Sequence, residues 1–223
     1  MFAYSIFFCE YCSVNCDALY KKVTQRETEF MIRYHIRRIW NWLHRMGYSR
    51  GFGVQSPSAY SFIRYVLNEH YPYYAYAPLC EKHKAESHAT KKKGRLYFRL
   101  ANFAQATCWY DYLPETEAYA DYVCAGCQST VFKSIDATAI PQHFRIARLS
   151  MKGDYKAVYE ALSAVATADS ILILEGIYDN RDTKAFWKQV VERVEAVTTY
   201  DLYSCGIVLF DTSKFKHHYI VNF

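Results

Sequence analysis

The sequence predicts an α/β fold with a mostly parallel β-sheet, an antiparallel hairpin near the C-terminus and a helical extension at the N-terminus. After Gly94, short apolar runs alternate with segments of helical periodicity, as in sheets whose parallel strands are joined by helices. The run 170–175 reads SILILE, which is typical of a strand buried on both faces. Two further runs, 196–203 and 206–210, are separated by only a short break. That spacing predicts an antiparallel pair, which we expect at the edge of the sheet.

We expect three regions along the chain. Residues 1–30 show weak periodicity and are interpreted as a loosely attached extension. Residues 31–93 are predicted to form a helical N-terminal region. The α/β domain is predicted to span 94–223, because the polar segment that ends at Lys91–Gly94 has the composition of a domain boundary.

Two helices are expected in the N-terminal region. From Met31 to Arg45, apolar residues recur at spacings of three and four, which places them on one helix face. Ser56 and Pro57 have the residue types of an N-cap followed by the first helical position. The second helix should therefore start there and run to about Asn68.

The α/β domain is expected to alternate helices with strands before closing on strands alone. In order, we expect a helix at 95–105, a strand at 107–112, a helix at 115–127, a strand at 130–136, a short helix near Pro141, a weaker strand at 145–150, a helix at 155–165, a strand at 170–175, a helix at 181–194 and strands at 196–203, 206–210 and 218–223.

Composition places the chain among globular proteins. Hydrophobic residues make up 52% and charged residues 22%, which argues against a disordered chain. No apolar run approaches the ~20 residues that a membrane-spanning helix needs. The apolar start has no basic residues ahead of it and no small-residue cleavage site, so no signal peptide is expected. We therefore expect a cytoplasmic protein.

A basic segment lies between Met31 and Asn68, which contains no acidic residue. A solvated helix face explains such a segment, and so does a surface for nucleic acid or another anion. The arginines through which nucleic acid would bind are Arg33, Arg37, Arg38 and Arg45.

The cysteines offer a possible zinc site that we do not favour. Cys9 and Cys12 have CxxC spacing, as do Cys124 and Cys127, and four thiolates can hold a structural zinc. The two pairs are, however, more than a hundred residues apart in the sequence. We expect reduced thiols, with the second pair buried on a helix, and no metal site.

Three segments carry a resemblance to a known family. They are residues 51–57 (GFGVQSP), 94–103 (GRLYFRLANF) and 201–210 (DLYSCGIVLF). With the order of strands and helices, they resemble a family of class I S-adenosylmethionine-dependent methyltransferase-like proteins from Bacteroidetes. The resemblance covers about residues 31–223 and implies a Rossmann-like methyltransferase sheet with S-adenosylmethionine as its cofactor.

The resemblance also implies where the cofactor would bind. The acidic residue at the end of the first strand falls on Asp111, followed by Tyr112. The acid that binds the ribose hydroxyls falls on Asp136, at the end of the second strand. Glu175 follows the strong central strand, where the family commonly carries paired aspartates. As a single carboxylate, Glu175 makes a divalent-metal site improbable.

The cofactor loop departs from the family pattern. The glycine positions of the turn after the first strand fall on Leu113 and Glu117, although glycine there lets the backbone approach a cofactor closely. The resemblance thus implies a divergent member of the family with an eroded loop. An alternative interpretation makes Asp111 a cap for the next helix.

Three functions remain open on the sequence alone. The first is methyl transfer from S-adenosylmethionine to a small-molecule or macromolecular acceptor, a reaction that depends mainly on positioning. The second is a non-catalytic binding or scaffold protein derived from such an enzyme. The third is a nucleic-acid-associated module that uses the basic segment.

Overall fold

The structure, a computed structural model, describes residues 40, 43, 45, 47 and 53–223. The chain divides into two units, 1–47 and 48–223. The strands and helices from Pro57 onward all belong to the second unit. The expected extension at 1–30 lies outside the described residues, as do Arg33, Arg37 and Arg38, three of the four arginines through which nucleic acid would bind. No helix in the described part of the chain is long and apolar enough to cross a membrane.

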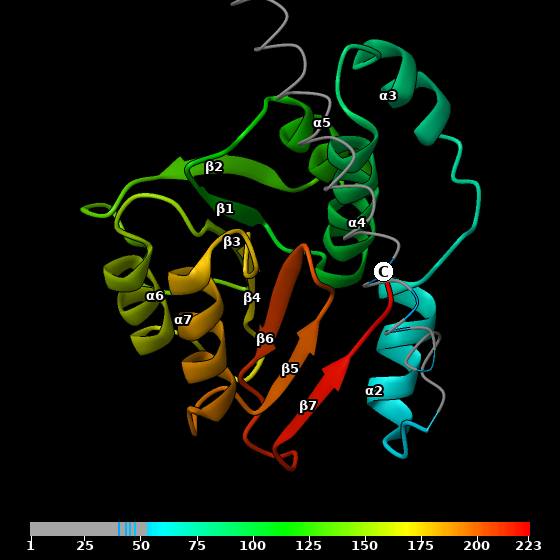
Figure 1. Ribbon diagram of the computed structural model, residues 1–223. Coiled ribbons are helices and arrows are strands. Elements are labelled where there is room, and N and C mark those ends of the chain that lie inside the picture. Colours follow the sequence, from blue (N-terminus) through cyan, green and yellow to red (C-terminus); the bar gives the residue numbers. More distant parts are fainter. Residues whose placement is uncertain (1–39, 41–42, 44, 46, 48–52) are drawn as a thin grey trace, which may run out of the picture. The chain divides into compact units, whose positions relative to one another are not determined.

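A seven-stranded sheet forms the centre of this unit, with the strand order β2-β1-β3-β4-β6-β5-β7 (Figure 1). Strands β2, β1, β3 and β4 lie side by side in that order and run parallel to one another. Strand β7 runs parallel to β5. Only β6 is antiparallel, pairing with both β4 and β5. This is the mostly parallel, Rossmann-like sheet that the sequence predicts. The strands are β1 (Cys108–Tyr112), β2 (Val131–Ile135), β3 (Ile146–Ser150), β4 (Ile171–Glu175), β5 (Thr198–Asp201), β6 (Cys205–Leu209) and β7 (His217–Ile220).

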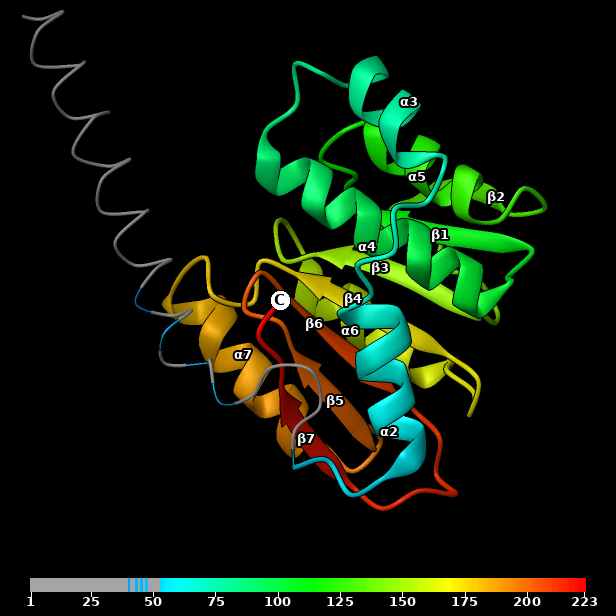
Figure 2. The same cartoon turned by 90° about the vertical axis from the view of Figure 1, so that its right-hand side faces the viewer.

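Helices cover both faces of the sheet (Figures 1 and 2). One face packs against α4 and α5 in a core that includes Leu100 and Val123. The other face packs against α6 and α7 in a core that includes Leu162 and Trp187. The helices are α2 (Pro57–Phe62), continued by the π-helical turn η2 (Ile63–Leu67), α3 (Tyr76–Lys82), α4 (His88–Ala104), α5 (Ala118–Gly126), α6 (Tyr155–Ala164) and α7 (Arg181–Glu192).

The predicted strands are confirmed, but the expected position of the hairpin is wrong. Strands β5 and β6 are antiparallel as predicted. Strand β6, however, lies inside the sheet between β4 and β5, and β7 forms the edge. The pair lies inside because β7, with its half-buried Tyr219 and Ile220, adds to β5 from the other side.

Helix α4 overturns the expected boundary between 93 and 94. The helix begins at His88, where the Ser87 side chain accepts a hydrogen bond from the Thr90 backbone N–H. The lysine run and Gly94 therefore lie within a continuous helix and not in a linker. Lysine is a good helix former, so a lysine run is compatible with the first turns of a helix.

Two smaller expectations are also corrected. Residues 137–144 around Pro141 form no helix. Cys124 lies exposed on α5, while Cys127 is buried just beyond it.

Two further helix starts, those of α2 and α7, are also capped by side chains. Pro57 follows the N-cap Ser56, as predicted, and the helical segment buries Phe62 and Leu67. At α7, Asn180 and Thr183 form a reciprocal capping box, in which the Asn180 side chain accepts from the Thr183 backbone N–H at 2.8 Å.

The Asn180 cap gives a first testable prediction. Asn180→Ala should lower the free energy of unfolding by about 1 kcal/mol, because the Thr183 backbone N–H loses its side-chain acceptor. Urea unfolding measures the change. Gln189→Ala, on the exposed side of the same helix, is the control and should change stability little. An Asn180 variant as stable as this control would show that the cap contributes nothing.

Candidate functional site

The candidate site lies at the carboxyl ends of β1, β3 and β4, the place where open parallel sheets bind ligands. Side chains alternate between the two faces of a strand. Asp111, Arg148 and Glu175 therefore share one face with the buried residues Trp109 and Ile173, under α4 and α5. The register also places these three strands side by side.

Arg148 bridges the two predicted carboxylates. Its Nη1 donates to Asp111 Oδ1 at 2.6 Å, and its Nε donates to Glu175 Oε2 at 2.5 Å. The side chains of Asp111 and Arg148 are 0% exposed, and that of Glu175 is 3% exposed. The guanidinium also lies 5.0 Å from the centre of the Tyr119 ring. A fully desolvated cation is thus held between two carboxylates and an aromatic face.

Helices α4 and α5 add further donors to Glu175. Tyr97 donates its hydroxyl to Oε2 at 2.5 Å, and Tyr119 donates to Oε1 at 3.3 Å. The Lys93 ammonium donates to the same Oε1. Lys93 and Tyr97 reach one carboxylate because they are four residues apart, and so lie on the same helix face. Glu175 therefore has its hydrogen-bonding capacity filled by side chains of this chain.

Glu115 joins this cluster from the segment between β1 and α5. Its carboxylate accepts from Lys93 at 3.2 Å and from the more exposed Lys152 at 2.7 Å. We call the six charged residues the edge network, in which three carboxylates balance three cations. They are Lys93, Asp111, Glu115, Arg148, Lys152 and Glu175.

The pKa values follow from burial and from these partners. Burial raises the pKa of Asp111 to about 7, against the opposing effect of Arg148. Burial also opposes the charge of Arg148, but the nearby Tyr97 and Glu175 raise its pKa overall, so the guanidinium stays charged. For Glu115, hydrogen bonds from Lys152 and Lys93 outweigh burial and lower the pKa to about 2. The guanidinium at the centre of the network therefore stays charged between its carboxylate partners.

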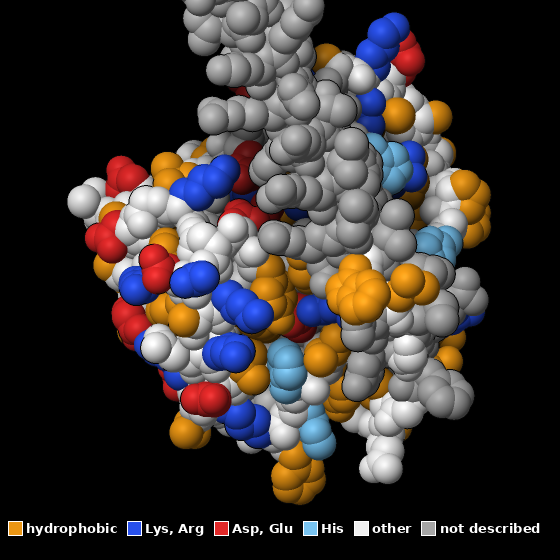
Figure 3. Space-filling view, in the orientation of Figure 1, with side chains coloured by type: hydrophobic (Ala, Val, Ile, Leu, Met, Phe, Trp, Pro, Cys, Tyr) orange, Lys and Arg blue, Asp and Glu red, His pale blue; other side chains and the backbone are white. Residues whose placement is uncertain are grey.

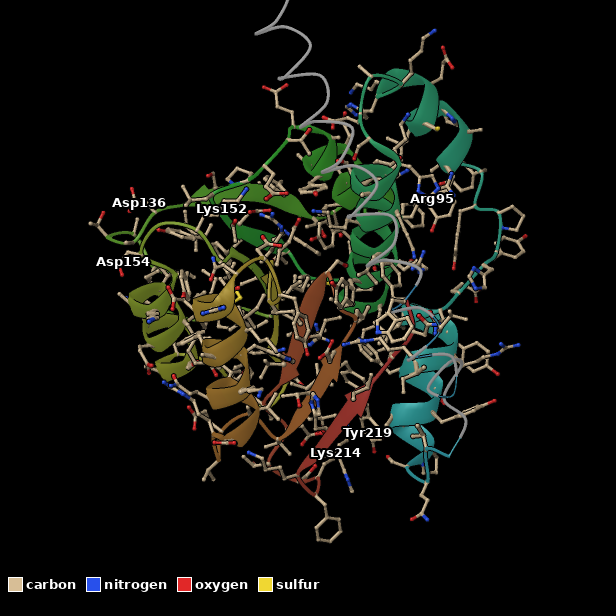
Figure 4. The ribbon with its side chains drawn as sticks, in the orientation of Figure 1. Arg95, Asp136, Lys152, Asp154, Lys214 and Tyr219 are labelled. Carbon is tan, nitrogen blue, oxygen red and sulfur yellow. The ribbon has the colours of Figure 1, made fainter. Side chains whose placement is uncertain are left out.

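Two of the four predicted site residues do not join this network. Tyr112 lies on the opposite face of β1, and its hydroxyl accepts from the Asp154 backbone N–H at 3.2 Å. Asp136 is exposed at the end of β2, the far edge of the sheet from β7 (Figure 4). Its Oδ1 accepts three hydrogen bonds from the turn that follows, from Thr138 N, Thr138 Oγ1 and Ala139 N.

The alternative interpretation of Asp111 as a helix cap is wrong. Helix α5 begins at Ala118, and its N-cap position is Glu117. Asp111 lies within β1, and its carboxylate accepts a hydrogen bond from Arg148.

The turn after β1 keeps a conformation that favours glycine. Leu113, at one of the expected glycine positions, has φ 53°, a left-handed conformation that costs a side-chain-bearing residue roughly 1–2 kcal/mol. Arg148 Nη1 lies 3.5 Å from the Leu113 carbonyl oxygen. The backbone of a glycine turn is thus present, but it carries a side chain and contacts the buried guanidinium.

Sequence reasoning missed Arg148, Lys93 and Tyr97. One signal was available, because Arg148 interrupts the otherwise apolar start of the strand 146–150. A charge in the middle of a buried strand requires a paired partner. No pattern in the sequence pointed from α4 to Glu175, since that contact depends on how the helix packs.

S-adenosylmethionine does not fit the residues present at this edge. The cofactor carries an ammonium group that needs a carboxylate, but Asp111 and Glu175 are both neutralised by a guanidinium of the chain itself. Glu115 adds a third carboxylate, which is held by two lysines. Within the described residues, no group of His, Cys, Asp and Glu side chains is arranged to hold a metal ion.

Several chains of solved structures are similar to this chain, and one of them is described here. No protein-family model and no curated protein matches the sequence. The S-adenosylhomocysteine-bound methyltransferase PaMTH1 from Podospora anserina matches with a TM-score of 0.46 and 10% sequence identity, over 69% of this chain and 93% of that chain. The identity is too low to carry functional residues across.

Proposed function

We propose that this chain is a methyltransferase-like protein that does not use S-adenosylmethionine and acts as a non-catalytic binding protein. The observation that supports the proposal is the fully buried Arg148 between Asp111 and Glu175. An internal cation occupies the carboxylates at the edge where the family places its cofactor.

Energetics favour this interpretation. A ligand of micromolar affinity must gain about 8 kcal/mol on binding. To reach Asp111, the cofactor would also have to separate a buried ion pair, which costs roughly 3–5 kcal/mol when one partner is lost. One hydrogen bond to a charged group contributes only about 1.5–3 kcal/mol. An Asp136–ribose contact therefore does not offset the cost.

One observation supports a second candidate, S-adenosylmethionine-dependent methyl transfer to an unknown acceptor. Asp136 remains exposed at the end of β2, and all three hydrogen bonds of its turn go to Oδ1. Methyl transfer depends mainly on positioning and needs few catalytic side chains. The edge network makes this the weaker candidate.

Calorimetric titration of the full chain with S-adenosylmethionine and S-adenosylhomocysteine separates the two candidates. We expect no binding heat at millimolar ligand. Asp136→Ala tests the ribose contact. The matched control is Asp211→Ala, because Asp211 caps an equivalent exposed turn at Ser213. A dissociation constant below ~10 μM that Asp136→Ala abolishes and Asp211→Ala preserves would establish the second candidate instead.

A further inference from the structure

A second site lies at the other end of the sheet from β2. A groove of about 810 Å³ runs between the helical segment α2–η2 and the strands β5 and β7. Figure 2 shows α2 beside these strands, and Figure 4 shows Lys214 and Tyr219 at this end, far from Asp136. None of the six edge-network residues lines the groove. The volume is in the range of pockets that hold small molecules.

Aromatic rings form the floor of the groove. Tyr200 and Tyr219, on adjacent strands, are stacked with ring centres 5.5 Å apart and an interplanar angle of 22°. Phe62 of α2 lies 5.0 Å from the Tyr200 ring, and His217 lies 5.7 Å from the Tyr219 ring. Burial raises the pKa of Tyr219, so its hydroxyl stays neutral. Tyr200 and Phe62 are buried, so they support the half-buried Tyr219 ring, on which a planar ligand can stack.

The wall opposite this floor is held rigidly. Arg99 of α4 donates through Nε to the Val66 carbonyl oxygen at 2.6 Å and through Nη2 to the Leu67 carbonyl oxygen at 2.9 Å. These bonds satisfy carbonyl groups at the end of η2, a π-helical turn of a kind often found at functional sites. The groove is therefore a pre-formed feature of packed elements, as ligand pockets usually are.

The ionisable side chains among the described residues that line the groove are basic or aromatic, and none is acidic. Among the described residues, the lining contains Lys214, His217 and the buried Arg99, together with several serine hydroxyls, and no carboxylate. Lys214 pairs with Asp211 at 2.9 Å, but its side chain is 42% exposed. Such a surface pair contributes little, so Lys214 can turn to a ligand anion. In Figure 3, histidine and hydrophobic side chains lie together over β7, whereas charges of both signs mix over α6 and α7.

We propose that this groove binds a planar aromatic acid, with the ring on Tyr219 and the anionic group near Lys214. The aromatic floor selects a planar ligand. The basic lining, which has no carboxylate among its described residues, selects an anion over a neutral or cationic analogue. The site does not depend on the edge network, and so it stands apart from the proposed function.

The test compares two probes of the same ring system on the full chain. Calorimetry with 2-naphthoate and with neutral 2-naphthalenemethanol should show tighter binding of the carboxylate. Tyr219→Ala should weaken both probes by about tenfold or more, which corresponds to about 1.4 kcal/mol. Tyr219→Phe should bind as the wild type does, because the ring remains.

The charge of the lining is tested separately. Lys214→Gln should weaken 2-naphthoate and leave 2-naphthalenemethanol unchanged. Lys156→Gln, an exposed lysine beside Tyr155 on the other face of the sheet, is the control and should change neither. Thermal unfolding shows whether the Tyr219 variants are folded. If they are not, the Lys214→Gln variant still tests the proposal, because Lys214 is exposed and its substitution should not disturb the fold.

Three results would overturn the proposal. The first is no binding of either probe at millimolar concentration. The second is equal affinity of the wild type for the acid and the alcohol. The third is binding of 2-naphthoate that Lys214→Gln leaves unchanged.

Discussion

Arg148→Ala should lower the free energy of unfolding by about 3–5 kcal/mol, the cost of leaving a buried charge without its partner. The substitution removes the one side chain that bonds both Asp111 and Glu175 inside the protein. Tyr97, Tyr119 and Lys93 would still bond Glu175, but Asp111 would lose its cation. Urea unfolding at neutral pH measures the loss.

Two comparisons separate a buried network from an ordinary ion pair. Arg193 also pairs with carboxylates, Glu160 and Glu195, but at the surface. Arg193→Ala should therefore cost only about 0–1 kcal/mol. The triple variant Arg148→Met, Asp111→Asn, Glu175→Gln removes all three charges together. It should recover much of the loss, because no unpaired charge remains among these three positions.

An Arg148→Ala loss no larger than that of Arg193→Ala would contradict the account. It would mean that water reaches Asp111 and that the centre of the network is not desolvated. A triple variant less stable than the single variant would also contradict it, since the charges would then contribute more than their burial costs.

Gly126→Ala should destabilise the protein by about 3 kcal/mol through overpacking. A Cβ at Gly126 would lie 2.2 Å from the Phe98 carbonyl oxygen, which belongs to the backbone of α4 and cannot rotate away. Helices α4 and α5 would have to separate. Helix propensity alone predicts the opposite sign, because alanine is favoured over glycine in a helix by roughly 0.5–1 kcal/mol.

Gly47→Ala is the matched control, because a Cβ there meets no described atom within 4 Å. Its unfolding free energy should stay close to that of the wild type. If Gly126→Ala were as stable as this control, the close approach of α4 and α5 would be wrong. The position of Lys93 and Tyr97 over Glu175 would then also be in doubt, since both lie on α4.

Local patterns in the sequence predicted most of the sheet. The SILILE run is the central strand β4, buried along its whole length, because a strand covered on both faces must be apolar throughout. The break at 204 does join an antiparallel pair. The position of that pair inside the sheet depends on β7 adding beyond β5, a long-range pairing that no local pattern encodes.

The candidate site was predicted only in part, for the same reason. Asp111 and Glu175 were identified because strand-end carboxylates recur in this type of sheet. That they face one cation could not be predicted, because it depends on β1, β3 and β4 being neighbours in register. The groove at β7 was missed as well, since its floor combines α2 with the last strands.

The central claim is that Arg148 takes the place of a cofactor between Asp111 and Glu175. The most direct measurement is a crystal structure of the full chain grown with millimolar S-adenosylhomocysteine. The account predicts Arg148 bonded to both carboxylates and no cofactor density at the carboxyl ends of β1 and β3. Cofactor density there, with the Arg148 side chain displaced from Asp111, would contradict it.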